Sequence, residues 1–150
     1  MRFVSPAISE EVAKYIVAQL ETLDHIHKDG LYFDLASIED CLTAAMDISH
    51  AISVHRGWWK EENRNVGEML ALMHSELSEA LEGARKDLTS DHIPGFSMVE
   101  EELADTLVRI FDFASAAKLR LGEAFIAKSK FNIGRTDHDL AVRAAGGKQF

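Results

Sequence analysis

The sequence contains few of the residues that mark several protein classes. Of its 150 residues, one is cysteine, two are proline and nine are glycine. The lone Cys41 has no partner for an internal disulfide, which indicates a reducing, cytoplasmic environment. So little proline and glycine excludes collagen-like chains and flexible linkers. No apolar run approaches the roughly 20 residues that a membrane helix needs, so we expect no contact with a membrane.

Basic residues are also scarce, and they are unevenly distributed. The chain has 16 Lys and Arg against 25 Asp and Glu, a net charge of −9. This excess of acid argues against a protein that coats nucleic acid. Residues 118–150 nevertheless hold seven of the basic residues and three of the acidic ones. An acidic body with a basic end can hold a divalent cation in one part and phosphates in the other, although a merely soluble tail explains the basic end as well.

Apolar residues make up 47% of the chain, and their spacing is helical. The pattern predicts helices over residues 9–23, 38–55, 65–85, 97–118 and 122–132, with 25–36 as a connection and no strands. Ser97 and Glu100 form a capping box at the start of the fourth helix. On the third and fourth helices we expect the leucines to face inward, among them Leu77, Leu81, Leu103 and Leu107.

These elements predict an all-α fold, an antiparallel bundle of four to five helices in a single domain. Residues 1–45 form a helical extension, 46–135 the core and 136–150 a basic, flexible tail. A bundle this rich in Met, Phe and Leu is expected to bury one face against a copy of itself, so we expect an oligomer.

Two consecutive predicted helices each carry a pair of acids three residues apart. The pairs are Glu76 with Glu79 and Glu102 with Asp105. Residues three apart share a helix face, and here that face is largely apolar. Acids placed there repel one another and lose hydration, unless a hard cation with oxygen ligands such as Mg²⁺ neutralises them. A solvated acidic face is the alternative for either pair alone. The nearby Glu82 and Glu101 are interpreted as ordinary surface acids.

Four motifs in order carry a resemblance to a known family. They are Arg56-Gly57-Trp58-Trp59, the stretch from Gly67 to Ala80 that includes Glu76-x-x-Glu79, the stretch from Glu102 to Asp112, and Lys128-x-x-Phe131-Asn132-x-x-Arg135. Residues 48–150 thereby resemble the MazG-like all-α nucleoside triphosphate pyrophosphohydrolases. Gly146-Gly147-Lys148 is similar to a basic end seen in some members. The chain departs from the family in its residues 1–45, in a longer interval before Lys148 and in Phe131, where the family has Tyr.

The resemblance implies Mg²⁺-dependent hydrolysis of a nucleoside triphosphate to the monophosphate and pyrophosphate, with Mn²⁺ as a possible substitute. It assigns metal binding and catalysis to Glu76, Glu79, Glu102 and Asp105. It assigns phosphate or sugar contacts to Lys128, Asn132 and Arg135, and more weakly to Lys148. Relatives of this kind form homodimers or homotetramers.

Two further features leave alternatives open. Trp58 and Trp59 lie at a predicted helix break, where each can stack on a nucleobase or simply pack in the bundle. Asp47-x-x-His50 is similar to the Glu-x-x-His element of di-iron bundles, but those need it twice and this sequence has it once. A silent Mg²⁺-nucleotide-binding or regulatory module, or a metal phosphohydrolase that releases orthophosphate, remain the rivals of the pyrophosphohydrolase.

Overall fold

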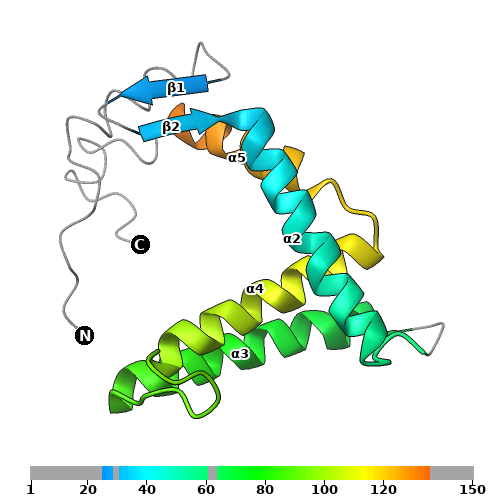
Figure 1. Ribbon diagram of the computed structural model, residues 1–150, viewed down its shortest axis with the longest axis vertical. Coiled ribbons are helices and arrows are strands. Elements are labelled where there is room, and N and C mark those ends of the chain that lie inside the picture. The colour runs from blue at the N-terminus through cyan, green and yellow to red at the C-terminus, as the bar shows by residue number, and fades with distance from the viewer. Residues whose placement is uncertain (1–24, 29–30, 61–63, 136–150) are drawn as a thin grey trace. The chain divides into compact units, whose positions relative to one another are not determined.

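The computed structural model describes residues 25–28, 31–60 and 64–135 (Figure 1). Two strands, β1 (His25–Lys28) and β2 (Leu31–Asp34), precede four helices: α2 (Leu35–His55), α3 (Val66–Lys86), α4 (Met98–Ala116) and α5 (Leu121–Ile133). The predicted helical class is confirmed for the described body of the chain. The expected helix over 9–23 and the tail over 136–150, with Lys148, lie outside the described residues. None of the helices that the structure describes is both long and apolar enough to cross a membrane.

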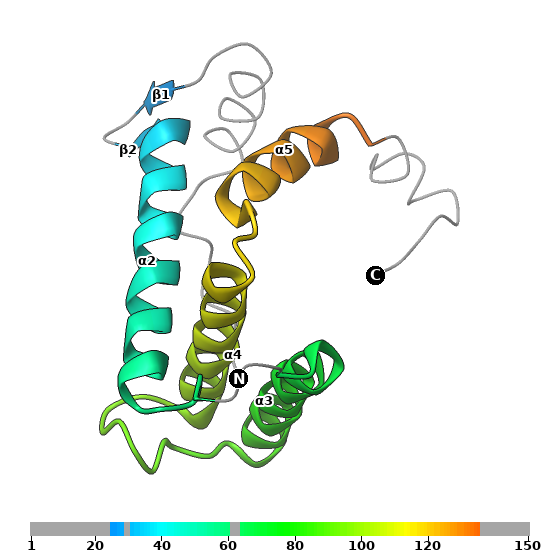
Figure 2. The ribbon, with the colours of Figure 1, turned by 90° about the vertical axis from the view of Figure 1, so that its right-hand side faces the viewer.

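The described residues divide into two compact units. The first comprises Thr43–Leu119, and the second comprises the described residues up to Leu42 together with those from Arg120 onward. In the second unit β1 and β2 form an antiparallel hairpin (Figure 1), and β2 leads directly into α2, whose full length is seen in Figure 2. The prediction of a strandless connection over residues 25–36 was therefore wrong. The strands are only four residues long, too short for the alternation of polar and apolar residues to stand out, but the Asp29-Gly30 pair between them is a hairpin signal in the sequence.

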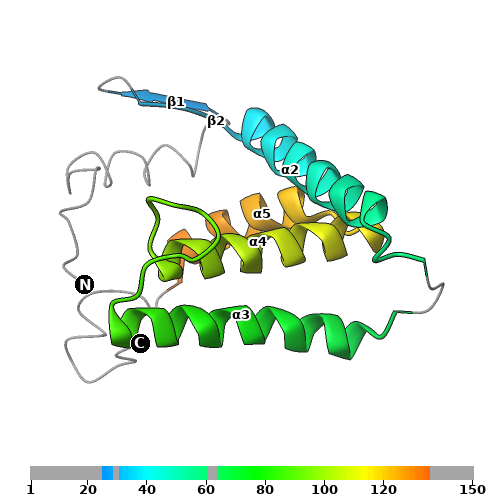
Figure 3. The same cartoon turned by 60° about the horizontal axis from the view of Figure 1, so that its bottom comes forward.

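In the first unit α3 and α4 lie antiparallel and side by side (Figure 3). Local signals set their ends. Asn65 caps α3 by accepting hydrogen bonds from the backbone N–H groups of Gly67 and Glu68, at 2.8 and 3.2 Å. The predicted capping box of Ser97 and Glu100 is present at the start of α4. Both helices therefore begin within a residue of the predicted position.

Small residues bring α3 and α4 together near the loop that joins them. Gly83 of α3 is buried, and a Cβ atom built on it would lie 2.9 Å from the Cβ of Met98. Such a contact is too close for any side chain at position 83, so glycine permits the approach. Ala80, one turn earlier, is also buried. The two helices thus meet along a face of small and polar residues.

The leucines of α3 and α4 do not line this face, which corrects the prediction that they point inward. Their exposed fractions are 45% for Leu77, 60% for Leu81, 46% for Leu103 and 51% for Leu107. No large side chain among the described residues is fully buried. Hydrophobic spacing gave the correct helices but the wrong packed face, because the close approach at Gly83 selects the face that carries Glu76 and Glu102.

Candidate metal centre

Three of the four predicted acids converge between α3 and α4. One carboxylate oxygen each of Glu76, Glu102 and Asp105 lies within 4.8 Å of the other two. Glu76 and Glu102 are buried, with 6% and 7% of their surface exposed, whereas Asp105 is exposed. Glu79 is exposed outside this group, and its Oε1 accepts a hydrogen bond from Ser75 Oγ at 3.4 Å. We call Glu76, Glu102 and Asp105 the acid cluster.

The acid cluster resists full ionisation. Burial raises the pKa of Glu102 from its ordinary 4.5 to about 7, aided by a hydrogen bond with Glu76 and by the negative charges of Glu79 and Glu76. Burial likewise raises the pKa of Asp105, with the charge of Glu76 as the next cause. A hydrogen bond between two carboxyl groups requires a proton on one of them. Glu76 and Glu102 therefore do not both ionise readily at neutral pH.

Arg109 supplies the nearest positive charge. Its Nε and Nη2 each lie 2.5 Å from Oε1 of Glu76, so the guanidinium holds that carboxylate in place from α4. The same charge acts to lower the pKa of Asp105, but less strongly than burial and Glu76 act to raise it. One guanidinium opposite three carboxylates leaves the group acidic. The ligand atoms that the acid cluster offers are all carboxylate oxygens, and two of its three residues are buried. This set fits a hard divalent cation.

Glu101, next to Glu102 in the chain, is not the surface acid that we predicted. It is buried, and its Oε1 lies 2.7 Å from Nδ1 of His92 in the loop between α3 and α4. Hydrogen bonds from Ser90 and then His92 lower the pKa of Glu101, against the effect of burial. Glu82 does behave as a surface acid, because it pairs with Lys86 one turn along α3.

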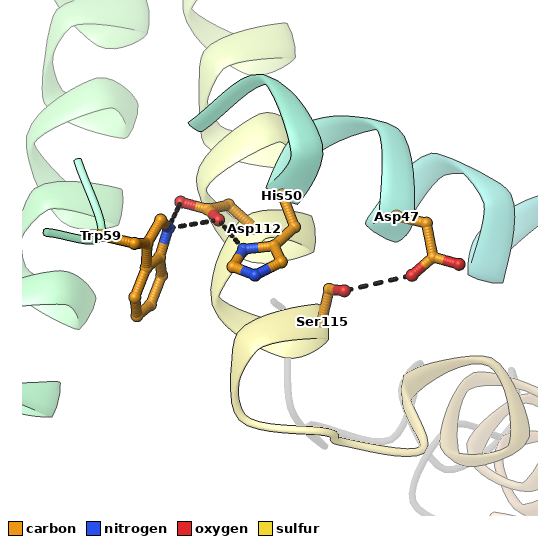
Figure 4. Close-up of polar contacts among 5 residues, drawn as sticks. All are labelled: Asp47, His50, Trp59, Asp112 and Ser115. Atoms are coloured by element: carbon orange, nitrogen blue, oxygen red, sulfur yellow. Dashed lines mark hydrogen bonds and ion pairs between the residues drawn. The ribbon is translucent and has the colours of Figure 1, made fainter. Parts of the chain in front are cut away.

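Another buried carboxylate, that of Asp112, lies further along α4 and has a different environment (Figure 4). The indole Nε1 of Trp59 donates to its Oδ1 at 2.8 Å and to its Oδ2 at 3.1 Å. Nδ1 of His50, on α2, lies 2.8 Å from Oδ1. The Arg64 guanidinium lies 4.8 Å from the ring centroid of Trp59. Asp112 is thus held by donors from two other segments of the chain.

The Asp47-x-x-His50 element takes part in this packing. Its histidine contacts Asp112, and Asp47 accepts a hydrogen bond from Ser115 Oγ at 3.1 Å. Both residues therefore tie α2 to α4 (Figure 4). In the described part of the chain neither belongs to a group of three or more potential metal ligands. This arrangement gives no support to a di-iron site.

The two neighbouring tryptophans have different surroundings. The indole N–H of Trp59 donates a hydrogen bond to Asp112, whereas Trp58 is exposed and lines a pocket in the first unit. Leu72, Val108 and Phe113 give that pocket apolar walls, and Arg64, Arg109 and Asp112 give it charged groups. Arg109 thus contacts both the pocket and the acid cluster.

The predicted phosphate-binding residues belong to the second unit. Lys128 and Asn132 lie four residues apart on α5, both exposed, and Arg135 follows the end of the helix. The Nζ of Lys128 lies 4.6 Å from the ring centroid of Phe131. The structure therefore confirms the predicted helix, and the assignment of these side chains to a ligand stays a prediction.

Comparisons with protein-family models, with curated proteins and with solved structures find no match to this chain. Function must therefore be inferred from the side chains. The sequence patterns predicted no role for Arg109 or Asp112, although these residues follow Asp105 by four and seven positions and so share its face of α4. His92 and its link to Glu101 carry no such periodic signal, because the loop conformation alone brings them together.

Proposed function

We propose that this chain is a Mg²⁺-dependent nucleotide pyrophosphohydrolase that cleaves (deoxy)nucleoside triphosphates to the monophosphate and pyrophosphate, in the manner of the MazG-like family. The observation that supports this most is the acid cluster between two packed helices. Buried carboxylates that face one another are costly to the fold unless a proton or a cation neutralises them. The substrate of such a reaction is a polyanion that itself binds Mg²⁺. The physiological role in this proposal is the removal of unwanted or surplus nucleotides.

Each residue of the centre has a role in this proposal. Glu76, Glu102 and Asp105 hold the cation, and Glu79 supplies the fourth carboxylate that the family resemblance assigns. A cation held there neutralises phosphate charge, polarises the attacked phosphorus and lowers the pKa of a bound water. Arg109 positions Glu76 through its two short contacts. The negative charge of Glu79 helps to raise the pKa of Glu102, which supports the assignment of Glu79 to the same centre.

The pocket lined by Trp58 supports contact with the nucleobase. Its apolar walls and exposed indole suit a flat ring, and Arg109 adjoins both pocket and acid cluster. Trp59, also predicted to contact the base, acts in this proposal through its hold on Asp112. Lys128, Asn132 and Arg135 contact the phosphates or the sugar, Arg135 by a two-pronged contact and Lys128 as a point charge. Lys148 keeps its weaker assignment to phosphate.

The exposed leucines of α3 and α4 support the proposal that the chain forms a homodimer or homotetramer. Val66, Leu70, Leu77 and Leu81 recur at intervals that place them on one face of α3, and each is at least 45% exposed. Leu103 and Leu107 repeat the pattern on α4. Helices bury such faces against another layer, and a second copy of the chain would provide one.

A silent Mg²⁺-nucleotide-binding or regulatory module is the alternative, and the Arg109–Glu76 ion pair favours it. That pair already partly neutralises one of the carboxylates without any metal. A module of this kind would bind nucleotide and release no product. A phosphohydrolase acting on another phosphoanhydride would release orthophosphate instead.

The test is product release from a panel of canonical and modified ribo- and deoxyribonucleoside triphosphates with Mg²⁺ or Mn²⁺. We expect pyrophosphate, not orthophosphate, from wild type, and loss of it in Glu102→Gln and Glu79→Gln. Glu68→Gln is the matched control, because Glu68 is an exposed acid at the other end of α3. Nucleotide binding without any product would favour the silent module. Orthophosphate as the product would favour the other hydrolase.

A further inference from the structure

The loop between α3 and α4 is closed by its own hydrogen bonds. The hydroxyl of Ser90 accepts from the backbone N–H groups of His92 and Ile93, at 3.2 and 2.9 Å. The backbone N–H of Ser90 donates to the carbonyl of Phe96 at 3.0 Å, and that of Met98 donates to Leu88 at 3.0 Å. These bonds fix the position of His92 on the loop.

The side chain of His92 is anchored at one nitrogen and exposed elsewhere. Its Nδ1 lies 2.7 Å from Oε1 of Glu101, yet 84% of the side chain is exposed, against 10% for Glu101. The pKa of His92 is raised from 6.5, first by the hydrogen bond to Glu101 and then by the charge of Glu101, with smaller effects from Asp91 and Glu102. With Nδ1 donating to the carboxylate, Nε2 is the ring atom left to meet a ligand.

The anchor links His92 to the part of α4 that carries two members of the acid cluster. Glu101 lies four residues before Asp105 on α4, and residues at that spacing are surface neighbours about 5–6 Å apart between Cβ atoms. The charge of His92 acts to lower the pKa of Asp105, and the charge of Glu102 helps to raise the pKa of His92. His92, which carries a positive charge when protonated, is thus hydrogen-bonded to the same part of α4 that carries an otherwise acidic group. A polyanion bound at such a group needs donors as well as a metal ion.

Building on the proposed function, we propose that His92, oriented by Glu101, contacts the polyphosphate of the substrate and holds the pyrophosphate product. The loop from α3 to α4 is then part of the substrate site as well as a connection. A purely structural role, in which His92 and Glu101 only fasten the loop, predicts no change in the affinity for phosphate. The two roles therefore differ in how much the affinity of the full-length protein for pyrophosphate depends on His92.

The probe is inorganic pyrophosphate with Mg²⁺, titrated calorimetrically into the full chain. We expect His92→Gln to weaken binding about tenfold, the size of one charge-assisted hydrogen bond. His92→Arg keeps the positive charge and is expected to bind within about twofold of wild type. Glu101→Gln removes the anchoring charge and is expected to fall between the two. The matched control is His74→Gln, because His74 is an exposed histidine on α3 away from the loop. This variant should bind pyrophosphate as the wild type does.

Kinetics give a second readout of the same role. If triphosphates are hydrolysed, His92→Gln should raise KM about tenfold and change kcat less, while melting temperatures show that it folds. Unchanged pyrophosphate affinity and KM in a folded His92→Gln variant would overturn the proposal for His92 and leave the proposed function intact. Absence of pyrophosphate binding in the wild type would also overturn the proposal for His92. Binding that depends on His92 without any hydrolysis would uphold the proposal for His92 and reject the enzymatic function.

Discussion

Helix α4 buries carboxylates at two places, and their surroundings differ. Asp112 faces the indole N–H of Trp59 and the imidazole of His50, both at hydrogen-bond distance. Glu102, ten residues earlier, faces Glu76, with the charges of Glu79 and Glu101 nearby, and its pKa rises to about 7. Both side chains are about equally buried, at 6% and 7% exposure. Burial alone therefore does not distinguish the two environments.

The neighbours of the two acids make the difference. Donors on the chain satisfy Asp112, so its burial stabilises the contact of α4 with α2 and Trp59. Glu102 meets acceptors of its own kind, so its burial costs stability until a proton or a cation arrives. Buried charges that lower the free energy of unfolding in this way are typical of a site that binds a charged ligand. Removing Glu102 and removing Asp112 should therefore have opposite consequences.

The largest effect is expected on activity in Glu102→Gln. If the acid cluster binds the catalytic cation, pyrophosphate release should fall at least about a hundredfold, while the melting temperature stays the same or rises because a repelling charge is gone. Product release and thermal melting on the same preparation measure both. Loss of activity together with a large loss of stability would make Glu102 a structural acid like Asp112.

Asp112→Ala should lose stability. Removing a buried acceptor leaves the indole N–H of Trp59 and the ring of His50 without their partner, which costs about 2–4 kcal/mol in the free energy of unfolding. Asp112→Asn keeps one carbonyl oxygen as an acceptor and should lose less. Chemical denaturation monitored by circular dichroism gives both values. A stable Asp112→Ala variant would show that the network does not support the fold.

The pH dependence of the metal effect distinguishes the acid cluster from ordinary acids. Glu102 has a pKa of about 7 in the folded chain and an ordinary value of 4.5, so between these values the unfolded chain loses the proton first. Without metal this group makes stability fall as pH rises from 4.5 to 7. Millimolar Mg²⁺ binds the ionised cluster, so it should raise the melting temperature more at pH 8 than at pH 5. An equal shift at both values, or the same pH profile in Glu102→Gln, would argue against the cluster.

The smallest expected effects separate the two tryptophans. Trp59→Phe keeps a ring but loses the hydrogen bonds to Asp112, and it should cost about 1 kcal/mol of stability. Trp58→Phe should leave stability unchanged and raise KM a few-fold, because Trp58 is exposed and lines the pocket. Denaturation and steady-state kinetics of the two variants provide the comparison. Reversed results would exchange the roles of the two rings.

The sequence was most informative where local chemistry decides the structure. Helices α3 and α4 follow from apolar spacing and from the caps at Asn65 and Ser97, and the two acid pairs follow from the same period. The packed face did not follow, because periodicity cannot tell that the glycine at position 83 selects which side of α3 approaches α4. Contacts across elements, such as His50 with Asp112 or His92 with Glu101, depend on the chain fold and are not encoded at short range.

The buried Gly83 has a consequence for the spacing of the acid cluster. It fixes how close α3 and α4 approach one turn of helix beyond Ala80, and Glu76 lies seven residues before it on the same face. The distance between the opposing carboxylates is therefore coupled to the absence of one methyl group at position 83. Oxygen ligands surround Mg²⁺ at about 2.1 Å and Ca²⁺ at about 2.3–2.6 Å. In the proposed function, a glycine outside the acid cluster would thus help to set the spacing of the cation's ligands, at the place where the two helices touch.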